Sequence, residues 1–381
     1  MTYSWETAIA AATTTGALPA VDVPLADALG LVLAADVLAG SDLPSFDTSA
    51  MDGWAVAGPP PWTLTGSQMP LLAGSLGGPL GPGSAVGIAT GARLPGGAHA
   101  VLRRERGQVT AGVLHGPELP PGQDVRPKGS ECRAGEVVAA QGLLVRPAAL
   151  GLAAAAGADL LRVIRRPTVD VYVLGDELLD FGPTRDALVR DALGPLLPGW
   201  LASFGAAVLG VQRLADTADA LRAALTGSTA DLIVTTGSTA RGPVDHLHRV
   251  LAEVGAELVV DGVAVRPGHP MLLARLTRGQ MLVGLPGNPL AAVSGLVTLV
   301  GPTLRAMRGA GPVDRPLVRL ETAVVGHPVD VRLVPVRGGL PVHHVGPAML
   351  RGLAVADALA VIPPGGAVAG QLVTTLTLPG S

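Results

Sequence analysis

Residues 231–245 read DLIVTTGSTARGPVD, an apolar run that passes into a loop of small and polar residues. The β-branched residues at 231–236 indicate a strand. Further strands are predicted at 168–174 (TVDVYVL), 206–214 and 281–285, and helices at 186–204 (interrupted near Pro198), 216–225, 244–254 and 290–307. Strands that alternate with helices favour right-handed βαβ crossovers, so we expect an α/β layer with a mostly parallel sheet.

The sequence on either side of this layer does not show the alternation of strands and helices. Residues 1–35 are predicted to be helical, because Leu25, Leu29 and Leu33 recur at helical spacing. Short apolar stretches cut by glycine and proline are typical of a turn-rich β domain. The predicted domains are a discontinuous N-terminal domain (1–45 and 140–166, with a helix over 147–158), a turn-rich β domain (46–139), an α/β domain (167–310) and a C-terminal β domain (311–381).

The composition excludes several classes of protein. The 52 glycines and 34 prolines among 381 residues suggest disorder, but 48% hydrophobic residues and a net charge of −3 exclude a disordered chain. The slightly acidic balance, without an extended basic cluster, argues against a nucleic-acid partner. The single cysteine, Cys132, excludes internal disulfides and cysteine-rich zinc sites, and we expect it to be a packed apolar side chain.

One segment is apolar enough to suggest a membrane span. Residues 281–304 contain no charged side chain, but Pro286, Gly287, Asn288 and Pro289 interrupt them early. A strand, a tight turn and a buried helix explain this pattern better than a span. The first twelve residues carry Glu6 and no basic residue, unlike a secretory signal. We therefore expect a soluble, cytoplasmic protein without a membrane partner.

Ligands of open α/β sheets bind beyond the carboxyl ends of the strands. Three loops have this position, namely 175–177 (GDE), 237–245 and 286–289 (PGNP). The last two lead into a helix, whose free N–H groups and dipole favour an anion. Taken singly, each loop is explained better as an ordinary turn.

Three acids, Glu177, Asp216 and Asp245, stand at this predicted edge. Together they could hold Mg²⁺, which prefers carboxylate and phosphate oxygens. Taken separately, Asp216 is expected to be a helix N-cap and Glu177 a solvated loop acid. The histidine pairs are poorly spaced for metal binding, so no zinc site is predicted.

Five strings occur in order along the chain: LPSFDTSAMDGWAV (43–56), TGARLPGGAHAV (90–101), GDEL (175–178), VRPGHP (265–270) and GLPGNP (284–289). Together with the linker GQDVRPKGSECRAGEVV (122–138) they span almost the whole chain. The sequence thereby resembles the molybdopterin molybdenumtransferase family, which includes the bacterial MoeA type and the E domain of gephyrin.

The resemblance implies a homodimer whose elongated protomer has four domains. It also implies that the protein inserts molybdate into adenylylated molybdopterin with Mg²⁺ assistance and releases AMP. It also makes molybdopterin adenylyltransferase and molybdoenzymes candidate partners. In the family, the cleft lies between the α/β domain of one subunit and the turn-rich domain of the other.

By motif position, the resemblance assigns catalytic roles to Asp52, Thr90, Glu177, Asp216 and Asp245, the last three also as metal ligands. It assigns pterin or oxyanion binding to Gly175, Asp176, Gly237, Ser238, Thr239, Arg266, Pro286, Gly287, Asn288 and Pro289.

The sequence departs from the family pattern at Leu174, Leu193, Gly262, His269 and Ala291, where the family usually carries hydroxyl, amide or lysine side chains. These departures leave a second interpretation open. The chain could be a non-catalytic paralogue that binds molybdopterin or the finished cofactor, as a carrier or assembly protein. A structural scaffold built on the family's dimer is a third interpretation.

Overall fold

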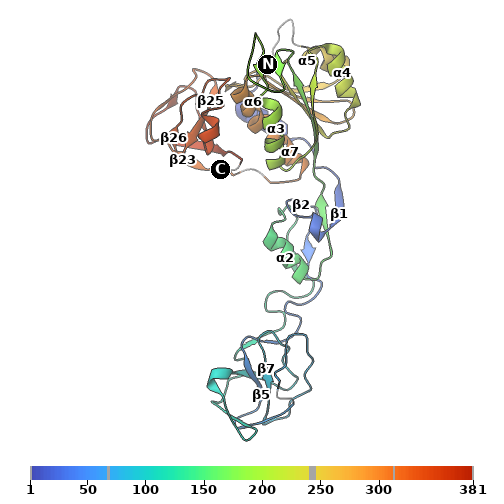
Figure 1. Ribbon diagram of the computed structural model, residues 1–381, viewed down its shortest axis with the longest axis vertical. Coiled ribbons are helices and arrows are strands. Elements are labelled where there is room, and N and C mark those ends of the chain that lie inside the picture. The colour runs from blue at the N-terminus through green and yellow to red at the C-terminus, as the bar shows by residue number, and fades with distance from the viewer. Residues whose placement is uncertain (1, 67–68, 240–245, 312–313, 380–381) are drawn as a thin grey trace. The chain divides into compact units, whose positions relative to one another are not determined.

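The structure is a computed structural model that describes residues 2–66, 69–239, 246–311 and 314–379. Its contacts divide the chain into two compact units (Figure 1). Unit 1 comprises Met1–Val21, Gly30–Ala34 and Val163–Ser381, and unit 2 comprises Asp22–Leu29 and Ala35–Arg162. The finer division into four domains stays a prediction.

A six-stranded sheet with the order β17-β14-β18-β22-β21-β19 organises unit 1. Four strands are parallel, as predicted: β17 (Ala207–Leu214), β14 (Thr168–Leu174), β18 (Leu232–Thr236) and β22 (Met281–Leu285). Two strands that the sequence did not predict, β21 (Leu272–Arg275) and β19 (Glu257–Asp261), extend the sheet antiparallel.

Helices cover both faces of this sheet (Figure 1). One face packs against α4 (Ala218–Gly227) and α5 (Leu247–Glu253), and the other against α1 (Trp5–Thr13), α3 (Leu193–Ser203), α6 (Pro289–Gly295), the π-helical turn η3 (Leu296–Val300) and α7 (Gly301–Met307). Successive side chains of a strand point to opposite faces of the sheet, which explains why both faces are covered. In β18, Leu232 and Val234 pack into one core cluster and Ile233 packs into the other.

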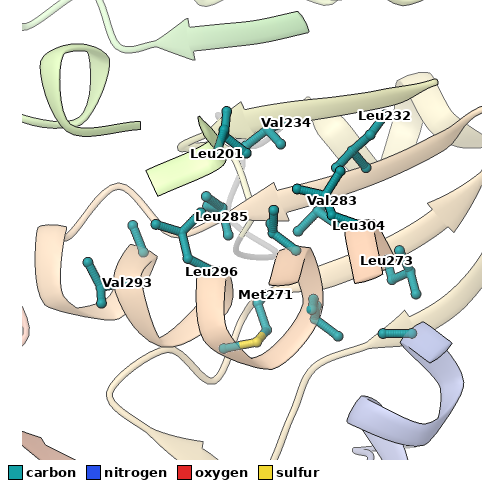
Figure 2. Close-up of a cluster of buried hydrophobic side chains, with 14 of the residues drawn as sticks. Leu201, Leu232, Val234, Met271, Leu273, Val283, Leu285, Val293, Leu296 and Leu304 are labelled. Atoms are coloured by element: carbon teal, nitrogen blue, oxygen red, sulfur yellow. The ribbon is translucent and has the colours of Figure 1, made fainter. Parts of the chain in front are cut away.

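The run Pro289–Met307 is long and apolar enough to cross a membrane, but 72% of its most apolar window is buried within the described residues. Figure 2 shows Val293, Leu296 and Leu304 on this run beside Val283 and Leu285 of β22. Burial against the sheet is the packing expected of a core helix, and the helix begins directly after the predicted turn.

Unit 1 contains a second sheet of six strands, five of them in the order β20-β25-β27-β29-β23 and the sixth, β26, beside β25. These are β20 (Val265–Arg266), β25 (Val331–Arg337), β27 (Ala358–Ile362), β29 (Leu372–Thr377) and β23 (Leu317–Arg319), and β26 (Leu340–Pro341) pairs with β25. Strands β24 (Val324–Val325) and β28 (Gly366–Ala367) pair beside them, and β15 (Leu178–Leu179) pairs with β16 (Val189–Arg190). Leu333 and Leu359 of the second sheet belong to the larger core cluster of the α/β layer.

Unit 2 is dominated by a six-stranded β-sheet, in line with its turn-rich sequence. The strands in sheet order are β8 (Ala100–Arg103), β5 (Gly53–Ala57), β7 (Ser84–Ile88), β6 (Trp62–Leu64), β10 (Val113–His115) and β9 (Gln108–Thr110). Two strand pairs, β4 (Thr48–Ser49) with β11 (Val125–Arg126) and β3 (Val37–Leu38) with β12 (Val137–Ala139), and the helix α2 (Pro147–Ala155) complete it. Cys132 is buried beside Ala39 and Ala156, as expected of a packed apolar side chain.

The predicted helix over 1–35 is wrong beyond Thr13. The strands β1 (Ala20–Pro24) and β2 (Val32–Leu33) pair with β13 (Leu160–Ile164), and Leu25–Asp27 form a single 3₁₀ turn. The regular leucine spacing did not mark a helix face, because Leu29 is exposed whereas Leu33 is buried in a strand. Pro24, which lacks an N–H group, and Gly30, at φ +76°, do not suit a continuous helix.

The predicted helix over 186–204 is also shorter in the structure, because α3 begins at Leu193. The Asp191 carboxylate accepts hydrogen bonds from the N–H groups of Leu193 (2.9 Å) and Gly194 (3.0 Å), which satisfies donors that a helix start leaves free. Pro198 lies inside α3 and does not interrupt it.

Candidate functional site at the carboxyl edge of the sheet

The parallel strands of unit 1 end at one edge of the sheet. Leu174 at the end of β14 is in register with Leu214 of β17, and Thr236 of β18 with Leu285 of β22. The loops that follow these four strands therefore emerge side by side. They hold the residues that the sequence places at 175–177, 216, 237–239 and 286–289.

Gly237 lies where three of these loops meet. Its N–H group donates to the Leu285 carbonyl (2.9 Å), and a Cβ atom at this position would lie 3.2 Å from the Leu174 carbonyl oxygen. A Cβ on Gly287 would in turn lie 3.8 Å from the Gly237 Cα. With φ at +82°, position 237 suits glycine both by conformation and by space.

Asp216 links two loops through hydrogen bonds. Its carboxylate oxygen Oδ1 accepts from the Ser238 hydroxyl (3.2 Å), and its N–H group donates to Oδ1 of Asp176 (3.2 Å). The prediction that Asp216 is the N-cap of α4 is wrong, because Thr217 occupies that position and its hydroxyl accepts from the Ala220 N–H group. The Asp216 carboxylate is therefore available to the edge, and Ser238 adopts the left-handed φ of +52° beside it.

The Glu177 side chain folds back over Gly175. A Cβ atom on Gly175, whose φ is +134°, would lie 2.8 Å from Oε2 of Glu177. Arg213, near the end of β17, supports this loop by donating to the carbonyl groups of Gly175 (3.2 Å) and Asp176 (3.4 Å). The sequence analysis did not single out Arg213, whose only sequence signal is a cation near the end of a strand.

The N–H groups in the first turn of α6 have an acceptor, whereas the sequence analysis expected this helix start to offer free N–H groups. Pro289 has no N–H group, and the N–H groups of Leu290 (2.9 Å) and Ala291 (3.3 Å) both donate to the Pro347 carbonyl. This main-chain acceptor comes from a distant part of the sequence, so the local pattern did not reveal it. Gly287 and Asn288 remain exposed at the edge.

Two predicted ligand-binding residues have other partners in the structure. Thr239 is buried, with its methyl group 3.1 Å from the position that a Cβ on Gly284 would take. The Nε of Arg266 donates to Oδ2 of Asp330 (2.8 Å), a carboxylate that is only 10% exposed. Among the described residues, no hydrogen bond or ion pair joins Arg266 to the four edge loops.

In unit 2, the structure brings Asp52 and Thr90 together from separate strings of sequence. The N–H group and the hydroxyl of Thr90 donate to the same Asp52 carboxylate oxygen, at 2.7 and 2.8 Å. The backbone donor of Thr90, and then its hydroxyl, hold the pKa of Asp52 below its ordinary value. Gly53 allows this string to sit against β8, since a Cβ there would lie 1.9 Å from the Leu102 carbonyl oxygen.

The metal prediction depends on Asp245, which lies outside the described residues. Within the described ranges, no group of three or more His, Cys, Asp and Glu side chains gathers closely enough to hold a metal ion. The edge does supply the hard oxygen donors that Mg²⁺ prefers, from Glu177, Asp216 and Ser238, so its chemistry suits that ion.

Comparisons with known proteins show the family of the chain. Family models match residues 3–157, as the MoeA N-terminal region (domain I and II), and residues 170–306, as a probable molybdopterin binding domain. A molybdopterin molybdenumtransferase of Staphylococcus aureus is 31% identical over 77% of this chain and 73% of its own length.

Two further relatives match a similar or larger share of this chain. Molybdopterin molybdenumtransferase 2 of Mycobacterium tuberculosis is 33% identical over 78% of this chain and 77% of its own length. The crystal structure of the molybdopterin biosynthesis MoeA protein from Pyrococcus horikosii superposes with a TM-score of 0.83 at 26% identity, covering 100% of both chains. The chain therefore belongs to the molybdopterin molybdenumtransferase (MoeA) family.

Proposed function

We propose that this protein inserts molybdate into adenylylated molybdopterin with Mg²⁺ assistance and releases AMP. The observation that supports this most strongly is the linked set of polar groups, Asp176, Asp216 and Ser238, at the edge where ligands of α/β sheets bind. Relatives that carry the name of this activity match most of the chain.

The substrate carries a phosphoanhydride, which water cleaves to give AMP and a phosphate-terminated pterin. Gly237 and Gly287 carry no side chain, so the loop backbones can approach a phosphate closely. Glu177 and Asp216, together with Asp245, would hold Mg²⁺. When bound, this ion offsets negative charge on the phosphate oxygens.

We propose further that the protein acts in the cytoplasm as a homodimer, in which Asp52 and Thr90 of one copy complete the edge of the other. The support for this arrangement is the family resemblance of both strings. Mixed dimers of Asp52→Ala and Asp216→Ala subunits test it. If the site is shared, each mixed dimer keeps one intact site, so the mixture regains activity that both parent proteins lack. A mixture as inactive as its parents would contradict sharing.

The reaction itself is tested with purified protein, adenylylated molybdopterin, molybdate and Mg²⁺, by measuring AMP and by activating a cofactor-free molybdoenzyme. We expect AMP and active cofactor to form together, and neither to form at the full rate when molybdate or Mg²⁺ is left out. Tight binding of the pterin without AMP release would refute turnover and support the carrier interpretation.

A further inference from the structure

A cavity of about 680 Å³ lies in unit 1, and its lining residues come from the opposite edge of the sheet. Ser203 and Phe204 lie at the end of α3, with two residues between them and β17, and Arg305 and Arg308 lie at the end of α7. The cavity is therefore separate from the loops that follow the parallel strands. Its volume falls within the range of roughly 300–1,000 Å³ that is typical of small-molecule sites.

The lining combines an apolar wall with positive charge. Ile9, Phe204 and Leu376 contribute apolar surface. The charged residues among the described lining are Arg305, Arg308 and Arg315, and the carboxylates of Glu6 and Asp314 lie beside Arg315 and Arg305 without being part of the lining. This pairing of an apolar wall with cations suits a ligand that has both an apolar body and an anionic group.

Arg308 is the most informative of these cations. Its Nη1 donates to the Phe204 carbonyl (2.8 Å) and its Nη2 to the Gly30 carbonyl (2.7 Å). Within the described part of the chain, no carboxylate lies at ion-pair distance from it. Burial lowers the pKa of Arg308, and the nearby charges of Arg305 and Arg166 lower it further. Arg308 is half-buried, and a cation that is partly withdrawn from water beside like charges is disfavoured unless an anion compensates it.

The other two arginines have neighbours of their own. The Nε of Arg305 donates to the Gly311 carbonyl (2.7 Å), and Asp314 lies close enough to act on its charge. Arg315 pairs with Glu6 (3.1 Å) and lies over the Trp5 ring, 5.1 Å from its centroid. A guanidinium carries five N–H donors, and the two carbonyl contacts of Arg308 use two of them.

We propose that this cavity binds a small organic anion, with a carboxylate or phosphate group at Arg305 and Arg308 and an apolar body against Ile9, Phe204 and Leu376. Nothing in the proposed reaction requires this ligand, so the site is a second binding site. Arginine donors form charge-assisted hydrogen bonds with both kinds of anion.

Calorimetric titration of the full-length protein with four probes tests the proposal. The probes are 1-naphthyl phosphate, 1-naphthoate, the neutral 1-naphthol and inorganic phosphate. We expect at least one naphthyl anion to bind about 10-fold more tightly than 1-naphthol and inorganic phosphate, since that ratio corresponds to about one net hydrogen bond to a charged group. The stronger of the two naphthyl anions identifies the group that the site prefers.

Two variants address the site directly. Arg308→Gln removes the half-buried cation, and Ala306→Phe fills the cavity while keeping the arginines. Both should weaken binding of the preferred anion about 10-fold or more, while AMP release stays unchanged. The matched control Arg278→Gln removes an exposed arginine whose side chain contacts the Thr226 carbonyl elsewhere, and it should bind as the wild type does. If Arg308→Gln does not fold, the binding affinity of Ala306→Phe for the preferred anion tests the proposal alone.

Three results would overturn the proposal. One is equal binding of 1-naphthol and the naphthyl anions, and another is equal binding of inorganic phosphate. The third is displacement of the probe by adenylylated molybdopterin, which would place the probe in the proposed reaction site instead. Since AMP release is measured separately, failure here leaves the proposed function untouched.

Discussion

The two edges of the α/β sheet carry charged side chains of opposite sign. At the carboxyl edge, acids and a serine bond to one another and to the main chain through Asp176, Asp216 and Ser238. At the amino edge, Arg308 bonds to carbonyl groups, and its nearest charged neighbours are other arginines. Hydrogen bonds hold the polar oxygen atoms of the first edge in place, whereas the second edge retains positive charge that the proposed anion would compensate.

The largest effect should follow from removing the central acid of the carboxyl edge. Asp216→Ala removes a proposed Mg²⁺ ligand and the acceptor of the Ser238 hydroxyl, so we expect AMP release to fall about 100-fold or more. Thermal stability should change little, because Thr217 caps α4. Asp219→Ala removes an exposed acid one turn away and is the control. Equal activity of the two variants would contradict the role of Asp216.

Each edge contains a glycine at positive φ, so alanine substitutions can compare how the two edges contribute to the stability of the fold. Gly237→Ala and Gly205→Ala both place a Cβ at positive φ, the first 3.2 Å from the Leu174 carbonyl oxygen and the second 2.3 Å from the Arg308 guanidinium. We expect each to lower the free energy of unfolding by about 1–3 kcal/mol, measured by urea denaturation. Only Gly237→Ala should also lower the rate of AMP release.

Two helical glycines serve as controls for this comparison. A Cβ on Gly227 or Gly199 would meet nothing within 4 Å. Alanine at these positions should therefore leave stability unchanged or raise it by up to about 1 kcal/mol. If Gly205→Ala reduced AMP release as strongly as Gly237→Ala, the two edges would not act independently.

The smallest effect concerns Asp52, the acid that we propose completes the carboxyl edge from a second copy. Because the Thr90 donors lower its pKa in the folded state, Asp52 stabilises the fold above its unfolded pKa of about 3.9. That contribution is lost as the pH falls through the lower folded pKa. Thr90→Val keeps the N–H donor and removes the hydroxyl, so the Asp52 pKa should rise in an NMR titration. An unchanged pKa would show that the hydroxyl bond is absent in solution.

The sequence predicted the parallel strands and the loops of the carboxyl edge because both depend on local patterns. Apolar runs end at Leu174, Thr236 and Leu285, and turn residues follow each of them. Local patterns did not reveal partners that lie far away in sequence. The Pro347 carbonyl closes the start of α6, and Asp330 pairs with Arg266.

Competition between neighbouring residues for the same structural role explains another wrong prediction. Asp216 and Thr217 are both good N-cap residues, and only the fold shows that Thr217 takes this role. The amino-edge cavity was not predicted, because its lining comes from α1, α3, α7 and β29, which are separated along the chain. A local sequence pattern cannot show that elements so far apart along the chain line one cavity.

The most direct test of the central claim is hydrogen–deuterium exchange with and without adenylylated molybdopterin. We predict slower exchange in the loops 175–177, 237–239 and 286–288 when the pterin is bound. Exchange at 203–204 and 305–311, around the amino-edge cavity, should stay unchanged. Protection at the cavity, with none in the carboxyl-edge loops of a protein saturated with the pterin, would contradict the account.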